Sequence, residues 1–220
     1  MLEEDSLREW YSLNIYGDIE NVGLNTHVAP KGVVTKLIER AFWFSEKKSD
    51  ITGTQTKPRR STGGLHEFIT GGNSYVQNQG GQLTAPDLNT FFREGFTYGN
   101  DTKVLFAGGL VLQAINELAR GQIQTKPLDT TYGMKISSWH TAFGVVNIVH
   151  NPLFVEDYAG SAYLLDMDCF KYRHMEGRDT KLMTNIQAPD IDGMVDQYLT
   201  ECGLERQHAP KHALLKGVTG

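Results

Sequence analysis

Aspartates are the residues in this sequence whose type and spacing could support catalysis. They recur in the last third of the chain, at Asp166 and Asp168, at Asp179, and at Asp190 and Asp192. Two or three carboxylates brought together in space can hold Mg²⁺ and activate water for hydrolysis. One functional hypothesis is therefore a metal-assisted hydrolase that uses Asp166, Asp168 and Asp190.

Two further patterns are compatible with metal binding, but each is better explained as a turn. The segment Asp190–Gly193 resembles the start of a calcium loop, yet the glycine and the terminal acid do not both fall where that loop needs them. His208 and His212 lie close together, but Pro210 between them breaks the helix that would align their rings. We expect a turn at both places, and a surface turn at the histidine pair.

Glycines suggest two anion-binding candidates. The run Phe106–Leu110 lies between a predicted strand and a predicted helix, but it has neither the spaced glycines of a dinucleotide site nor the Lys-Ser/Thr pair of a nucleotide loop. Gly108 and Gly109 therefore indicate a sharp turn. Arg59–Gly64 combines guanidinium groups with flexible backbone amides, so it could bind an anion or an intersubunit carboxylate, or form a solvated loop.

Composition excludes several classes of protein and favours none that is catalytic. The 220 residues are 40% hydrophobic and carry a net charge of -5, which gives no general attraction to nucleic acid or to an anionic membrane. No apolar run is long enough to span a membrane, and the acidic N-terminus does not resemble a secretory signal. Cys169 and Cys202 are expected to be free thiols, and no serine lies in a nucleophile elbow. We expect no catalytic residue, metal or cofactor.

The first half of the chain predicts two helices separated by polar segments. Helical spacing of apolar residues predicts an amphipathic helix over Lys31–Lys47. The polar stretch Ser49–Thr62 is expected to be a surface loop, and Gly71–Gln82, rich in Gly, Asn and Gln, a linker. A second helix over Asp87–Gly95 starts after Thr84 and Pro86 and directs Phe91 and Phe92 into the core.

The second half is richer in strands. Lys103–Ala107 predicts a strand that passes through the glycine turn into a helix over Leu110–Arg120. Met134–Trp139 and Val145–Val149 predict a hairpin. Further short strands are expected at Tyr163–Leu165, Phe170–Arg173, Lys181–Ile186, Gln197–Leu204 and Ala213–Val218. Helices that precede strands indicate an α+β fold.

Several segments, in order and spacing, resemble a group of tailed-bacteriophage major capsid proteins. The first is Glu39–Phe44 followed by Pro58–Leu65, where the family's chain leaves a long helix. The others are Phe143–Phe154, Ala162–Asp168, Gly177–Leu182, Asn185–Ala188, Tyr198–Glu205 and His212–Gly217. No single segment is diagnostic, but their ordered occurrence along the chain is.

The resemblance implies the capsid fold of bacteriophage Hong Kong 97, with a peripheral domain built on a long helix and a sheet, and an axial domain of sheet and helices. Residues 31–82 would contain the end of the long helix, the polar loop and the start of the peripheral domain. Residues 83–160 would be mainly axial, and 161–220 would return to the peripheral domain. Residues 1–30 are atypical, because the family's N-terminal arm, extended loop and earlier part of the helix have no counterpart there.

The resemblance implies a structural function rather than an enzymatic one. The chain would be a major capsid subunit that assembles with itself into the hexamers and pentamers of an icosahedral shell, in the virion and after synthesis in the bacterial host cytoplasm. The shell would enclose DNA without reading its sequence, would not involve a membrane, and could meet scaffolding, portal or decoration proteins. Besides the hydrolase, a nanocompartment shell protein of related fold is the alternative, which a cargo enzyme would reveal.

Overall fold

A computed structural model describes residues 31–50, 59–122, 126–127, 136–186, 189 and 197–219. The chain divides into two compact units, each built from segments that are distant in sequence. Unit 1 comprises Met1–Glu67 and Lys171–Glu205, and unit 2 comprises Phe68–Phe170 and Arg206–Gly220. Among the described helices, none has the length and apolar character needed to span a membrane.

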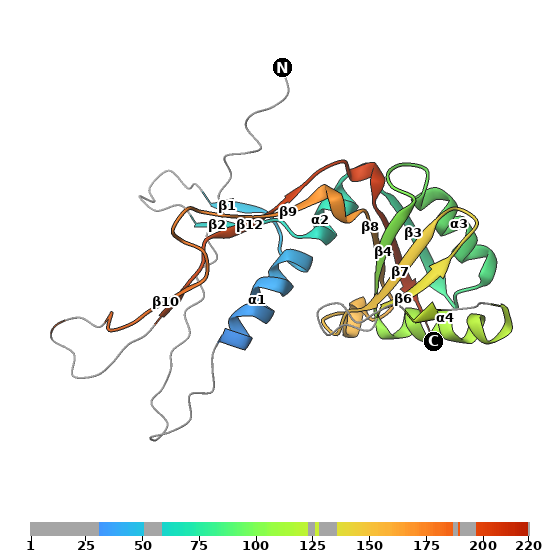
Figure 1. Ribbon diagram of the computed structural model, residues 1–220, viewed down its shortest axis with the longest axis horizontal. Coiled ribbons are helices and arrows are strands. Elements are labelled where there is room, and N and C mark those ends of the chain that lie inside the picture. The colour runs from blue at the N-terminus through green and yellow to red at the C-terminus, as the bar shows by residue number, and fades with distance from the viewer. Residues whose placement is uncertain are drawn as a thin grey trace, which may run out of the picture. The chain divides into compact units, whose positions relative to one another are not determined.

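Unit 2 is built on a seven-stranded mixed sheet with the order β3-β13-β8-β4-β7-β6-β5 (Figure 1). The β13–β3 and β4–β7 pairs are parallel, whereas β8 is antiparallel to both of its neighbours and β6 to both of its own. The strands are β3 (Tyr75–Gly81), β4 (Thr102–Ala107), β5 (Lys126–Pro127), β6 (Ile136–His140), β7 (Val145–His150), β8 (Ala162–Leu165) and β13 (Ala213–Val218). Because β8 and β13 flank one another beside β4 in this sheet, two strands from the last third of the chain share a core with strands from its middle.

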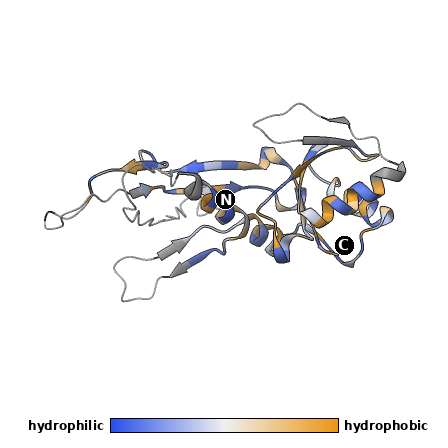
Figure 2. Ribbon diagram, turned by 90° about the horizontal axis from the view of Figure 1, so that it is seen from below, coloured by the Kyte–Doolittle hydropathy of each residue, from blue (hydrophilic) through white to orange (hydrophobic). Residues whose placement is uncertain are grey.

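Two amphipathic helices bury their apolar sides on one face of this sheet. They are α3 (Ala85–Gly95) and α4 (Gly109–Gln122), and α4 shows both apolar and polar stretches in hydropathy colouring (Figure 2). Phe91 and Phe92 of α3 are fully buried, and Val111 of α4 joins them in a single hydrophobic cluster with Leu105 and Leu164 of the sheet. This burial of aromatic and branched side chains is the main source of stability of unit 2.

Short helical turns connect the strands of unit 2. They are η2 (Glu156–Tyr158), η3 (Met167–Cys169) and η4 (Ala209–Lys211), while α2 (Leu65–Gly71) spans the sequence boundary between the units. On the sheet face opposite α3 and α4, Phe154 from the loop after β7 packs its ring 5.2 Å from that of the fully buried Tyr163. Both faces of the central strands are therefore covered.

The described residues of unit 1 form a helix and three two-stranded sheets, besides the start of α2. The helix α1 (Lys31–Phe44) is followed by β1 (Lys48–Asp50), which pairs with β2 (Arg59–Ser61) in antiparallel fashion. The other pairs are β9 (Phe170–His174) with β12 (Cys202–Arg206), and β10 (Lys181–Met183) with β11 (Gln197–Leu199). Trp43 at the end of α1 is buried, and the ring of Phe42 meets that of Tyr172 edge-on.

Most of the predicted elements are confirmed. The two helices predicted in the first half are α1 and α3, with Phe91 and Phe92 in the core as expected. The strand, glycine turn and helix are β4 and α4, and the hairpin is β6–β7. Strands also occur in every one of the five later segments where they were predicted. The α+β class is therefore confirmed.

Two predicted irregular segments contain strands. The linker prediction was wrong over β3, and the surface-loop prediction was wrong at its two ends, while residues 51–58 lie outside the described residues. The expected surface loop Ser49–Thr62 begins and ends in the β1–β2 pair, and the expected linker Gly71–Gln82 contains β3, the edge strand beside β13. Edge strands are solvated on one side, so Gln, Asn and Ser are tolerated there without the apolar alternation used to recognise strands. Gly80 has a φ of +62° and Gly217 one of +76°, where the β3–β13 register shifts.

Candidate functional site

In unit 2, the predicted site residues Asp166 and Asp168 form hydrogen bonds with the protein itself. Asp166 follows β8, is 1% exposed, and accepts hydrogen bonds from the backbone N–H of Asn100 at 3.3 Å, from the Asn100 side-chain amide at 3.2 Å and from the backbone N–H of Asp168 at 3.4 Å. The same Asn100 amide donates to the exposed Asp168 carboxylate at 2.6 Å. The structure thus brings Asp166 and Asp168 together. The Asn100 side chain bonds to both carboxylates, so it links the loop after α3 to the turn after β8.

Of the remaining predicted aspartates, the structure describes Asp179. Asp190 and Asp192 lie outside the described residues. In unit 1, Asp179 accepts hydrogen bonds from the Tyr172 hydroxyl at 2.6 Å and from the Thr180 backbone N–H at 2.8 Å, which lower the pKa of its carboxyl. Among the residues that the structure describes, no three His, Cys, Asp or Glu side chains gather closely enough to hold a metal ion.

Lys103 is a buried cation that the sequence patterns did not single out. It is 1% exposed on β4, and its ammonium group donates to the backbone carbonyls of Gly95 and Tyr98 at 2.7 Å each and of Lys211 at 2.6 Å. Burial lowers its pKa to about 8, although the nearby Asp166 carboxylate opposes the shift. In the sequence, the sign of this buried cation is the position of Lys103 at the start of the apolar run that forms β4.

His212 is part of the same buried cluster and is not available as a metal ligand. It is fully buried, its Nδ1 accepts the backbone N–H of Asp166 at 3.3 Å, and its Nε2 donates to the carbonyl of Gln207 at 3.2 Å. Burial lowers its pKa to about 4, so the ring is neutral at pH 7. The predicted surface turn is confirmed for η4 and the exposed His208, but the expectation is wrong for His212, which the chain turns inward as β13 begins.

The cluster of Asn100, Lys103, Asp166 and His212 connects loops of unit 2 through hydrogen bonds. Its polar groups pair with one another and with backbone, and no buried side-chain nitrogen or oxygen among the described residues lacks a hydrogen-bond partner. Gly99, with a φ of +97°, passes so close that a Cβ there would lie 2.8 Å from an Asp166 oxygen. The cluster holds together the loop after α3, the turn after β8 and the turn before β13.

In each anion-binding candidate, one glycine has a structural role, while the side chains of Arg59 and Arg60 lie outside what the structure describes. A Cβ at Gly108 would lie 2.4 Å from the carbonyl oxygen of Ala159, so this turn needs glycine for a close approach of two backbones. In the Arg59–Gly64 segment, the Gly64 N–H donates to the carbonyl of Ser45 at 2.6 Å, so that amide serves the chain itself. Cys169 and Cys202 are both buried free thiols, as predicted.

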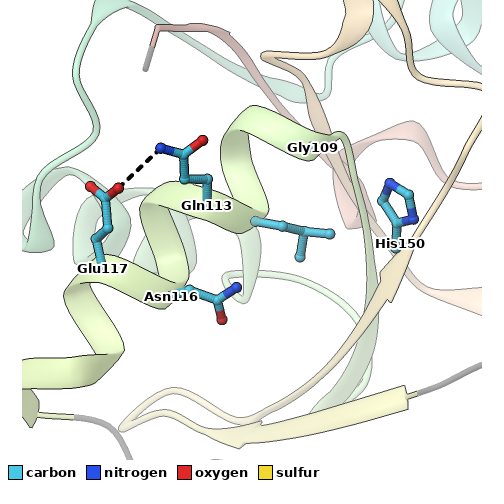
Figure 3. A pocket seen from close by; sticks show the side chains of 6 residues that line it. Gly109, Gln113, Asn116, Glu117 and His150 are labelled. Carbon is cyan, nitrogen blue, oxygen red and sulfur yellow. Dashed lines mark hydrogen bonds between the residues drawn. The ribbon is translucent and has the colours of Figure 1, made fainter.

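Beside α4, unit 2 has a hollow with a volume of about 570 Å³ (Figure 3). The lining side chains are mostly polar, and the Gln113 amide donates to the Glu117 carboxylate at 3.1 Å. The other lining residues are Gly109, Leu112, Asn116 and His150. Ligand sites are usually concave and mostly apolar, with a few converging polar groups, and this hollow lacks that character.

Exposed apolar side chains are the feature of the surface that suggests binding. In unit 1 most of them lie in β9, in β10 and in the residues after these strands, where every residue from 171 to 186 is exposed, and Leu37 of α1 is another. The largest are Tyr172 (45%), Met175 (45%), Leu182 (48%), Met183 (38%) and Ile186 (39%). Exposed apolar side chains that are this frequent along one segment are compatible with association between proteins.

Comparisons with known proteins identify the family. Among curated proteins no match was found. Solved structures similar to the chain include the virus-like particle from Pyrococcus furiosus, with 11% identity and a TM-score of 0.41 over 69% of this chain. The chain spans 59% of the length of that protein's chain, and similarity at this level does not establish a common fold.

The family model of the SU10 major capsid protein matches residues 33–219, almost the whole chain. The match includes both units, and it supports the expected location in a virion capsid. The resemblance found in the sequence is therefore confirmed, and the chain belongs to the SU10 major capsid protein family.

Proposed function

We propose that this chain is the subunit of an icosahedral shell that encloses DNA, and that copies of it assemble into hexamers and pentamers. The observation that carries this proposal is the match of the major capsid family across residues 33–219. The exposed apolar strands of unit 1 support it, because a shell subunit functions through surfaces that become buried on assembly. The nanocompartment alternative is less favoured, because the matching family is one of capsid proteins.

The proposed fold is the Hong Kong 97 type. In this assignment unit 1, which contains α1 and the two-stranded sheets, is the peripheral domain. Unit 2, with its seven-stranded sheet and two helices, is the axial domain at the capsomer centre. The strand β13 near the C-terminus then belongs to the axial domain, because it pairs with β3 and β8 in that sheet.

The proposed partners follow from the same role. Other copies of the chain are the main partner, and scaffolding, portal or decoration proteins are candidates for transient or local contacts. Contact with DNA would be independent of sequence, since a net charge of -5 provides no general attraction to phosphate. Assembly in the host cytoplasm fits the two free cysteines, which a reducing compartment keeps unpaired.

Light scattering and negative-stain electron microscopy of the purified full chain test this function. We expect rings, sheets or closed particles whose mass is many times 24.6 kDa. A chain that remains monomeric at all concentrations and ionic strengths would count against self-assembly. A particle that co-purifies with a folded enzyme as cargo would instead favour the nanocompartment.

A further inference from the structure

The chain passes between the two units three times, after Glu67, after Phe170 and after Glu205. The first passage lies within a helix, since α2 spans Leu65–Gly71. The second and third passages lie in neighbouring strands, because β9 starts at Phe170 and β12 ends at Arg206 in the same two-stranded sheet. We call the first the helical passage, and the second and third together the strand passage.

The two strands of the strand passage are held together by their own backbone. They pair with each other as β9 and β12, and just beyond that pairing the Gln207 N–H donates to the carbonyl of Cys169 at 3.0 Å. Backbone hydrogen bonds between strands fix the spacing of the strands independently of their side chains. The strand passage therefore behaves as one element.

Side chains of unit 2 connect the helical passage to the strand passage. Phe68 is the first unit 2 residue of α2, and the Arg206 guanidinium lies over its ring, 4.9 Å from the centroid. The centroid of the Phe68 ring also lies 6.2 Å from that of His212. The His212 ring in turn lies 4.6 Å from the ring of Phe170. Side chains from all three passages therefore belong to one cluster, and every member of that cluster lies in unit 2.

His212 gives this cluster a fixed base. The residue is fully buried, and its two ring nitrogens bond the Asp166 N–H and the Gln207 carbonyl. A ring held in this way cannot rotate without leaving a buried polar group unpaired. Phe68 and Arg206 are only half-buried, and single ring and cation–π contacts are weak. The cluster is therefore anchored at His212 and more easily opened at Phe68.

A second connection lies beyond the end of α2. The Ser74 hydroxyl donates to the carbonyl of Ala209 in η4, and a Cβ at Gly72 would lie 2.9 Å from the Cβ of Ala209. These contacts hold the chain that follows the helix. Opening the cluster at Phe68 would therefore free the direction of α2 without detaching its end from unit 2.

We propose that Phe68, Arg206 and His212 form a clamp that sets the direction in which the helical passage leaves unit 2 relative to the strand passage. Hinges consist of a few residues at the ends of elements, and the clamp residues lie at or beside such ends. In the proposed shell, one chain enters both hexamers and pentamers, and the clamp would limit how far the two units of a subunit can reorient. The inference itself concerns the single chain and does not depend on assembly.

Distances between two nitroxide labels, measured by pulsed electron paramagnetic resonance on the dilute, unassembled full chain, test the clamp. Labels at Lys36→Cys in α1 and Asn116→Cys in α4 report on the two units, because both positions are exposed and the two native thiols are buried. Phe68→Leu removes both ring contacts but keeps an apolar side chain, so we expect a distance distribution about twofold broader. Arg206→Met loses the cation–π contact alone and should broaden the distribution less.

Phe154→Leu is the matched control, because it also removes a ring contact of unit 2, the one with Tyr163 at 5.2 Å. Phe154 follows the end of β7, whereas the strand passage follows the end of β8, and these two strand ends lie at opposite edges of the sheet. The distribution should be unchanged in Phe154→Leu and in Phe68→Tyr, which keeps the ring. Denaturation curves check that each variant is folded.

A distribution that stays narrow in both Phe68→Leu and Arg206→Met would overturn the clamp. Equal broadening in Phe68→Leu and Phe154→Leu would also overturn it, because the effect would then come from any lost ring contact in unit 2. Both outcomes leave the proposed shell function intact, since particle formation is a separate measurement. A chain that never forms particles, yet shows the expected broadening, would overturn the shell function and support the clamp.

Discussion

At the scale of single residues, unit 2 depends on charges that do not face solvent. Lys103 brings a cation to three carbonyl oxygens, two of them in the segment where α3 ends and one beside β13. Asp166 holds the loop after α3 as well, through two hydrogen bonds from Asn100. Charged hydrogen bonds of this kind restrict loops to one arrangement, because any other arrangement leaves a buried group without a partner.

Replacing Lys103 with methionine should destabilise unit 2 severely. The substitution keeps the apolar stem but leaves three carbonyls without a donor and Asp166 without a nearby cation. We expect a loss of about 3 kcal/mol or more in the free energy of unfolding, measured by urea denaturation. Lys216→Met, at a half-buried position on β13, is the control and should change stability by no more than about 0.5 kcal/mol. Equal effects of the two substitutions would contradict the role given to Lys103.

His212 should make stability depend on pH in mildly acidic solution. Its pKa is about 4 in the folded protein against 6.5 in the reference state, so between these values the unfolded chain binds more protons and stability falls as pH decreases. The contribution lost approaches about 3 kcal/mol at pH 4. Asp166 opposes the shift, while Lys103 and Lys211 favour it.

Denaturation curves at pH 4 to 7 measure this effect. A His212→Gln variant keeps hydrogen-bonding groups but cannot titrate, so its stability should fall less over that range than that of the original chain. His208→Gln, at an exposed neighbouring position, should behave like the original chain. Parallel curves for all three proteins would show that other groups carry the pH dependence.

At the scale of elements, the turn between β4 and α4 requires glycine at one of its two glycine positions. A Cβ at Gly108 would collide with the Ala159 carbonyl, whereas a Cβ at Gly109 meets nothing within 4 Å. Gly108→Ala should therefore destabilise the protein by roughly 2 kcal/mol or more. Gly109→Ala should be neutral or stabilise it by about 0.5 kcal/mol, because alanine favours helices. Melting temperatures of the two variants measure the difference, and similar values would refute this account of the turn.

At the scale of the whole molecule, we expect that substitutions on the exposed surface can abolish assembly without changing the stability of the single chain. Leu182 and Met183 are 48% and 38% exposed in the single chain, so Leu182→Ser/Met183→Ser removes little buried surface. We expect unfolding free energy to change by less than about 0.5 kcal/mol and particle formation to be lost. Electron microscopy and denaturation of the same preparation test both parts. A variant that unfolds easily, or one that still forms normal particles, would contradict the assignment of these residues to an interface.

The sequence by itself determined the elements whose information is local, and it determined the family. Thr84 and Pro86 mark the start of α3 because helix starts need a cap and tolerate proline, and the Thr84 N–H indeed meets the Asp87 carboxylate at 3.2 Å. Apolar periodicity likewise predicted α1, β4 and α4. The ordered segments shared with phage capsid proteins indicate a shell subunit from the sequence alone.

Only the tertiary structure decided which polar residues are buried and which segments join a sheet. β3 has a polar sequence, and it is a strand because β13, more than 130 residues later, supplies its hydrogen-bond partners. Lys103 and Asp166 are buried because their partners arrive from loops that are distant in sequence. Local patterns cannot predict such contacts, because the free energy that orders a polar strand or buries a charge comes from groups that meet only after the chain has folded.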